Sequence, residues 1–185
     1  MIAMGSLSVD IDGRGIASLA DAFGATESQV QAAMRSTYGK MGRWMRTQSV
    51  RGLSSKLKIQ QKILRSRVRA FRMQNGVTGD GAGAKVWYGI KDIAFARLNP
   101  KESGGGVKAA GGRHEKGAFI ARMYGRDQVL KRIGKKRVPL RVVYADIAEE
   151  AVTYIEDVLV GTAAFDIQFY KFLEHEIRWR TSILK

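Results

Sequence analysis

The sequence predicts an α+β fold, with a long N-terminal helix, an antiparallel sheet interrupted by a long glycine-rich loop, and two C-terminal helices. Three observations predict this class. Apolar residues recur at three- and four-residue steps early in the chain and again near its end, which is the spacing of an amphipathic helix face. Between these regions, short segments alternate apolar and polar residues, as half-buried strands do. The segment 99–117 combines six glycines with very few apolar residues, which is typical of a loop.

The first expected elements are a strand, a short helix and a long helix. Residues 6–11 alternate in the manner of a strand, and apolar spacing predicts a helix over 15–23 that ends at Gly24. Residues 27–50 form the predicted long helix. Its apolar stripe consists of Val30, Ala33, Met34, Tyr38, Met41, Trp44 and Met45.

The predicted long helix contains two glycines, and a further glycine follows it. Gly39 and Gly42 each weaken a helix by about 1 kcal/mol relative to alanine, and we interpret them as marks of close approach by another backbone. The segment 52–55 breaks the apolar pattern, so we expect the helix to end before it. The next expected elements are a short helix over 58–64, a strand over 68–73, a turn-rich loop over 75–83, a strand over 84–90 and an extension of the same sheet over 93–98.

The segment 99–117 is expected to be a flexible loop or arm that becomes ordered only on assembly, because its composition offers little to bury. The elements after it are a strand over 118–124, its partner over 128–133, a basic turn over 134–137, a strand over 138–144 and a helix over 145–160. Thr162 is the expected cap of a last helix, whose inward residues are Phe165, Phe169, Phe172, Leu173 and Ile177.

Length and composition limit the class of protein. A chain of 185 residues is expected to form a single domain. The chain has no cysteine, which excludes disulfides and thiolate metal sites. No apolar stretch approaches the roughly 20 residues of a membrane span, and the N-terminus lacks the pattern of a signal peptide. We therefore expect no membrane partner and synthesis in a cytoplasm. The net charge of +15 indicates anionic partners.

The positive charge is concentrated in one segment. Residues 28–79 contain twelve lysines and arginines and no acidic residue. A mixed-sign surface is the usual pattern, so a run of one sign favours a polyanion or an acidic protein surface. The bases expected to face DNA or a partner are Arg35, Arg43, Arg46, Arg51, Lys56, Lys58, Arg65 and Arg67. The competing interpretation is a basic helix face that serves only solubility.

Negative charge gathers near the other end of the chain. Residues 146–176 contain eight acidic residues and a single base, Lys171. A chain with a basic front and an acidic rear can pack front to rear against copies of itself. The residues expected at such a subunit interface are Lys135, Lys136, Arg137, Glu149, Glu150, Glu156 and Asp157.

Motifs in the second half of the chain resemble a known family. They are Gly117-Ala118-Phe119-Ile120, a short basic hairpin, the run 136–144 (Lys-Arg-Val-Pro-Leu-Arg-Val-Val-Tyr) and a helical C-terminus. In this order they resemble the minor tail protein Z family, which are tail-completion proteins of long-tailed double-stranded DNA phages. The resemblance covers roughly residues 49–181 and, more loosely, the N-terminal helix.

The resemblance implies a non-enzymatic virion protein at the head-proximal end of the tail. It implies a hexameric ring next to the tail terminator and tail tube proteins, with genomic DNA in the lumen as a further contact. Two other classes stay open. One is a basic nucleic-acid-binding accessory protein that forms no ring. The other is an enzyme, which has little support because the two histidines, His114 and His175, lie outside any metal-ligand motif. We therefore expect no cofactor, no metal and no catalytic residue.

Overall fold

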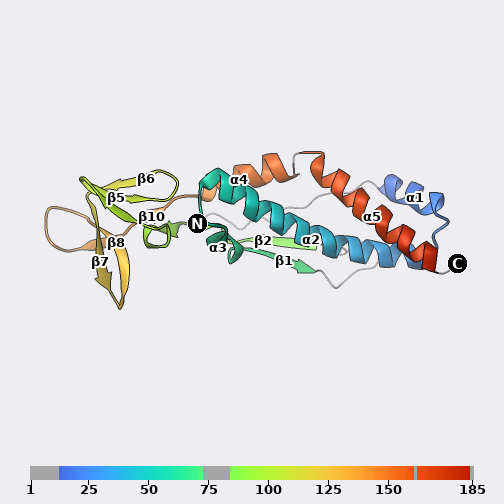
Figure 1. Ribbon diagram of the computed structural model, residues 1–185, viewed down its shortest axis with the longest axis horizontal. Helices are drawn as coiled ribbons and strands as arrows, with labels where there is room; N and C mark the ends of the chain where they lie inside the picture. Colours follow the sequence, from blue (N-terminus) through green and yellow to red (C-terminus); the bar gives the residue numbers. More distant parts are fainter. Residues whose placement is uncertain (1–12, 73–83, 161, 184–185) are drawn as a thin grey trace. The chain divides into compact units, whose positions relative to one another are not determined.

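The computed structural model describes residues 13–72, 84–160 and 162–183 (Figure 1). The strand expected over 6–11 and the loop expected over 75–83 lie outside these residues. Within them the chain is α+β, with a long helix, several small antiparallel sheets and C-terminal helices, as the sequence predicts. The fold forms two compact units, each assembled from separated segments, whereas the sequence favoured one domain. The first contains the described parts of 1–49, 68–89 and 155–185, and the second contains 50–67 and 90–154.

The first unit is built on two helices. They are the N-terminal part of α2 (Glu27–Leu57) and α5 (Ala164–Ile183), with α1 (Gly13–Ala22) beside them (Figure 1). The rings of Tyr38 and Phe169 lie 6.1 Å apart across this helix pair. Both helices contribute buried apolar side chains, namely Ala33, Met41, Met45, Phe165, Phe169, Leu173 and Ile177. The predicted stripe is thus partly right, since Val30, Met34, Tyr38, Trp44 and Phe172 are only half-buried.

A two-stranded hairpin runs alongside α2 in the same unit (Figure 1). Its strands are β1 (Val68–Arg72) and β2 (Ala84–Tyr88), which pair antiparallel as predicted. Two side chains of α2 form hydrogen bonds with the hairpin. Arg46 Nε donates to the Val68 carbonyl at 3.0 Å, and the Ser49 and Tyr88 hydroxyls lie 2.8 Å apart. Polar contacts therefore hold the hairpin at the end where Val68 pairs with Tyr88.

The helix α2 continues past the point where the sequence predicts its end. Gly52 lies within the helix, and Tyr154 occupies the space that a Cβ atom at this position would need, which is a packing reason for glycine here. The helix ends instead at Leu57, where Lys58 adopts φ = 51°. The Ile59 amide then donates to the Ser54 carbonyl at 3.2 Å, which is the hydrogen bond of a Schellman cap. The prediction that the helix ends before 52–55 is therefore wrong. In the sequence Gly52 looks like a helix stop signal, but in the structure a glycine is needed there for packing against Tyr154.

The second unit begins with the C-terminal part of α2 and the short helix α3 (Gln61–Arg65). The strands β3 (Ile93–Ala94) and β10 (Tyr144–Ala145) pair with each other, and a turn of 3-10 helix, Phe95–Arg97, follows β3. The prediction that 93–98 extends the sheet of β1 and β2 is therefore wrong. A three-stranded sheet contains β7 (Ala118–Met123), β8 (Arg126–Arg132) and β9 (Leu140–Val142). The predicted pairing of β7 with β8 is confirmed, with Phe119 opposite Leu130.

The glycine-rich segment forms a sheet of its own, so the prediction of a structureless arm over 99–117 is wrong. Its strands are β4 (Lys101–Ser103), β5 (Gly106–Ala109) and β6 (Arg113–Lys116), paired antiparallel in that order. Four glycines with positive φ lie at turns or just beyond strands: Gly105, Gly111, Gly112 and Gly117. The glycines thus supply tight turns.

Two anchors explain why this small sheet is ordered. Val107 of β5 is fully buried. The Arg113 guanidinium donates to the Leu57 and Ala110 carbonyls, both at 2.9 Å, and so satisfies an open carbonyl at the end of α2. A side chain at Gly111 would collide with Arg113. Glu115 adds an ion pair with Lys131 of β8 at 2.6 Å.

The C-terminal helical region has a break that the sequence did not predict. The expected helix over 145–160 is the α-helix α4 (Ala148–Tyr154) followed by a π-helical stretch, Ile155–Val160. Val158, expected on the apolar side, is 48% exposed, because the wider π-helical turns change which residues face inward. The Thr162 hydroxyl, predicted to cap the last helix, instead donates to the Val158 carbonyl of the preceding stretch at 3.0 Å.

Candidate functional site

Two of the predicted bases on the first unit are available to a partner. Arg35 and Arg43 are exposed on α2, and neither guanidinium has a hydrogen bond or ion pair with any residue that the structure describes. Arg46 is exposed but binds the Val68 carbonyl, so part of its role is structural. Among the predicted bases of this unit, Arg35 and Arg43 are therefore the two whose charged groups are open to a partner.

The remaining predicted bases belong to the second unit. Arg51, Lys56 and Lys58 are exposed near the end of α2, and the Arg65 side chain donates to Gln61 at 3.2 Å. Arg67 is half-buried, and its guanidinium donates to the Lys91 carbonyl at 2.5 Å. Burial and the nearby charge of Arg97 lower the pKa of Arg67 despite the opposing effect of Asp92. Arg67 therefore holds the chain between β2 and β3 and is a poor candidate for contact with a partner.

A cleft opens on the basic face of the first unit. It has a volume of about 320 Å³ and is lined by residues of α2, by Ala70 of β1 and by Glu176 of α5. The residues of α2 that line it are Arg35, Ser36, Tyr38, Gly39, Lys40, Gly42 and Arg43. Because residues four apart lie on the same face of a helix, Gly39 lies between Arg35 and Arg43 and leaves a notch where a side chain would stand.

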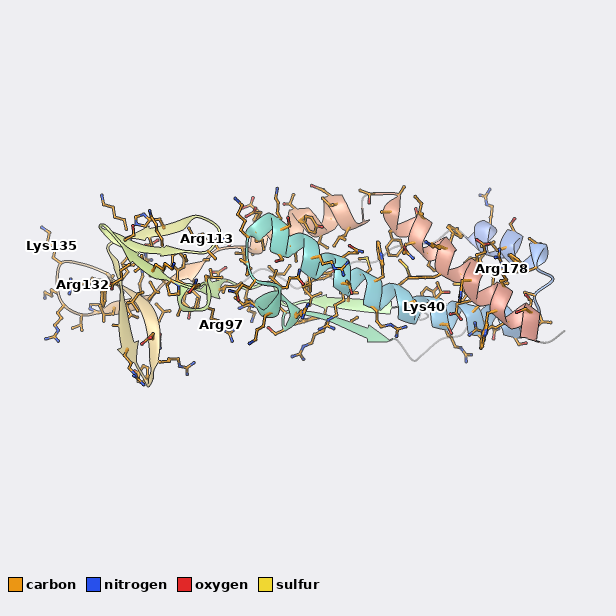
Figure 2. All side chains as sticks on the ribbon, viewed as in Figure 1. Lys40, Arg97, Arg113, Arg132, Lys135 and Arg178 are labelled. Carbon is orange, nitrogen blue, oxygen red and sulfur yellow. The ribbon has the colours of Figure 1, made fainter. Side chains whose placement is uncertain are left out.

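A network of charges forms the wall of the cleft on the side of α5. Lys40 on α2 (Figure 2) pairs with Glu176 Oε1 at 2.5 Å, and Arg180 pairs with Glu176 Oε2. Arg180 also donates to the Ser36 hydroxyl at 2.8 Å. Burial alone would raise the pKa of Glu176, but hydrogen bonds and charges from Lys40 and Arg180 outweigh it and hold that pKa below its ordinary value. Glu176 is thus an anion with both oxygens engaged.

The residues predicted at a subunit interface are all exposed. The loop between β8 and β9 carries Lys135, which is labelled in Figure 2, and the next two residues, Lys136 and Arg137. Glu149 and Glu150 lie in the first turn of α4, and Glu156 and Asp157 lie in the π-helical stretch. None of these seven has an ion pair within the described part of the chain, so they are available to a neighbour. Two other acidic residues of the same region, Glu174 and Glu176, are paired within the first unit.

Several residues of the cleft were not predicted as site residues from the sequence, namely Ser36, Tyr38, Gly39, Lys40 and Glu176. Gly39 was interpreted as a point of close approach by another backbone, but a Cβ atom added there would meet no atom of the described residues within 4 Å outside the neighbouring helix backbone. A usable signal was present, since Arg35, Gly39 and Arg43 follow one another at four-residue steps. The part played by Glu176 of α5 had no such signal, because it is far away in the chain.

Other kinds of site receive no support from the described residues. They contain no cluster of three or more histidine or acidic side chains that could hold a metal. No helix among them is both long and apolar enough to cross a membrane. Comparison of the chain with models of protein families, with curated proteins and with solved structures gives no match.

Proposed function

We propose that this chain is a structural protein of a phage virion, located at the head-proximal end of the tail, where it completes the tail and supports joining to the head. The observation that carries the proposal is the ordered set of motifs that resembles the minor tail protein Z family. Most of these motifs lie on or beside the sheet of β7, β8 and β9. Gly117–Ile120 enters and forms the start of β7, the basic hairpin is the turn to β8, and the run 136–144 contains β9 and continues into β10 of another sheet.

The distribution of charge supports assembly as a ring of copies. Exposed cations lie on α2 and on the loop 133–139, and exposed carboxylates lie on α4 and the π-helical stretch. Opposite charges on different elements suit a heterologous, head-to-tail contact, which closes into a ring when the rotation per subunit allows it. In this proposal the cations of α2 that remain uncovered face DNA in the lumen.

Electron microscopy of particles from the genome that encodes this chain tests the proposal. We expect a ring of copies at the head-proximal end of the tail in wild-type particles. Deletion of the gene should leave tails that do not join heads, and supplying the chain from a plasmid should restore joining. Normal particles without the chain, or the chain located elsewhere, would overturn the proposal.

A second candidate function is DNA binding by a chain that forms no ring. The cationic cleft on α2 favours it, because Arg35 and Arg43 need no neighbouring subunit to be accessible. The two candidates differ in solution. A binder of this kind would associate with DNA as a monomer, with an affinity that falls steeply as salt rises. A tail protein would instead be incorporated in stoichiometric amounts in purified tails.

A further inference from the structure

The cleft of the first unit combines positive charge with an opening to the helix backbone. Of the nine residues that line it, Arg35, Lys40 and Arg43 are cationic and Glu176 alone is anionic. Sites for apolar small molecules are lined mainly by apolar and aromatic side chains. The lining of this cleft is therefore suited to a small anion rather than to an apolar ligand.

Gly39 has no packing reason to be glycine within the described residues. A Cβ atom added there would meet no described atom within 4 Å outside the neighbouring helix backbone, and its φ is not positive. Glycine inside a helix costs about 1 kcal/mol relative to alanine. The benefit visible in the structure is the notch, which lets a ligand approach the helix between two arginines. Each of these arginines starts about 6 Å from Gly39 along the helix axis, a span that its side chain can bridge.

Glu176, the single carboxylate that lines the cleft, repels a bound anion only weakly. Lys40 and Arg180 engage both oxygens of Glu176, so its charge is compensated inside the wall of the cleft. Arg35 and Arg43 have no such compensation among the residues that the structure describes. Burial raises the pKa of the Tyr38 hydroxyl, which therefore stays protonated at neutral pH.

We propose that this cleft binds a phosphate group, seated over Gly39 between the guanidinium groups of Arg35 and Arg43. Guanidinium groups present forked N–H donors that match phosphate oxygens. The phosphate can belong to a nucleic acid backbone or to free phosphate, since both offer the same oxygens. The inference rests on the cleft alone and does not require the role in a phage tail.

Titration of the full chain with inorganic phosphate, followed by amide chemical shifts, tests the site. We expect saturable shifts concentrated at residues 35–43. Two variants should weaken binding by about tenfold or more: Arg35→Gln with Arg43→Gln, which removes two charge-assisted hydrogen bonds, and Gly39→Leu, which fills the notch without changing any charge. The matched control is Lys62→Gln with Lys171→Gln, which removes two exposed charges outside the cleft and should leave phosphate binding unchanged.

Repeating the titrations with a single-stranded oligothymidylate distinguishes the sources of the phosphate. If Gly39→Leu weakens both ligands, the site takes the nucleic acid backbone, and if it weakens inorganic phosphate alone, the site takes free phosphate. Shifts that spread over all basic surfaces without saturation, or variants that bind like the wild type, would overturn the inference. Either failure would leave the proposed role in the tail untouched, because that role is tested on particles. The melting temperature of each variant shows whether a loss of binding reflects a loss of folding.

Discussion

A Cβ atom added at Gly52 of α2 would overlap the ring and hydroxyl of Tyr154, whereas one added at Gly39 would meet no described atom within 4 Å outside the neighbouring helix backbone. Both glycines are helical and belong to the same helix. Helix propensity alone predicts the same effect for alanine at either position. The packing around each glycine therefore decides whether its replacement by alanine raises or lowers the free energy of unfolding.

This contrast gives a matched pair of predictions. Gly39→Ala should raise the free energy of unfolding by about 0.5–1 kcal/mol, because alanine is the better helix former. Gly52→Ala should lower it by about 1–3 kcal/mol, because Tyr154 must move. Denaturant unfolding of both variants measures the difference. Stabilisation by both substitutions would show that Tyr154 does not pack on Gly52.

At the level of secondary-structure elements, the ion pairs of Glu176 join α2 to α5 in the first unit. The depressed pKa of Glu176 stabilises the folded state fully above its ordinary value of 4.5. That stabilisation is lost as the pH falls through the lower pKa of the folded state, because protonation then weakens the contacts with Lys40 and Arg180.

Glu176→Gln should therefore lower the free energy of unfolding by about 2 kcal/mol at neutral pH and reduce its dependence on pH below 4.5. The matched control is Glu174→Gln, two residues away, where the exposed pair with Arg178 should contribute less than about 1 kcal/mol. Urea unfolding at a series of pH values checks both. Equal effects of the two substitutions would contradict a special role for Glu176.

The small sheet of β4, β5 and β6 is the second test at this scale. Val107→Ala should lower the free energy of unfolding by about 2 kcal/mol, because it removes two fully buried methyl groups and leaves a cavity. Lys108→Ala, at the exposed neighbouring position, should change it by less than about 0.5 kcal/mol. The measurement is denaturant unfolding. If deletion of residues 103–112 left the melting temperature unchanged, the segment would be a loose arm after all.

Charge is the property that matters at the scale of the whole molecule. The chain carries a net charge of +15, so copies repel one another unless opposite patches meet. Exposed ion pairs contribute only about 0–1 kcal/mol each and are screened by salt. In addition, Glu115, Glu174 and Glu176 form ion pairs within the chain. Fewer carboxylates are therefore left for a neighbour than the sequence suggests.

We accordingly predict that the isolated protein is a monomer and that copies form a ring only on the tail. Sedimentation velocity at low and high salt checks this. The sedimentation coefficient should correspond to a single chain at high salt, with weak association at most when salt is low. A closed oligomer that persists at high salt without tail proteins would contradict the prediction.

Local pattern was sufficient for much of the fold. The stripe of α2, the hairpin of β7 and β8 and the apolar face of α5 follow from periodicity, because each element must bury one side. The accessible bases Arg35 and Arg43 were also predictable, since they lie off that stripe. These features depend on residues close together in the chain.

Tertiary structure decided what depends on distant residues. Tyr154 leaves room only for glycine at position 52 of α2. The glycine-rich sheet is anchored because Arg113 binds the Leu57 carbonyl at the end of α2 and Val107 is fully buried. The cleft exists because Glu176 of α5 and Ala70 of β1 stand beside Gly39. The sequence by itself determined which faces are apolar and where positive charge gathers. Packing between segments far apart in the chain determined where α2 ends, which glycines form turns and where the cleft opens. These properties depend on atoms that no local sequence pattern contains.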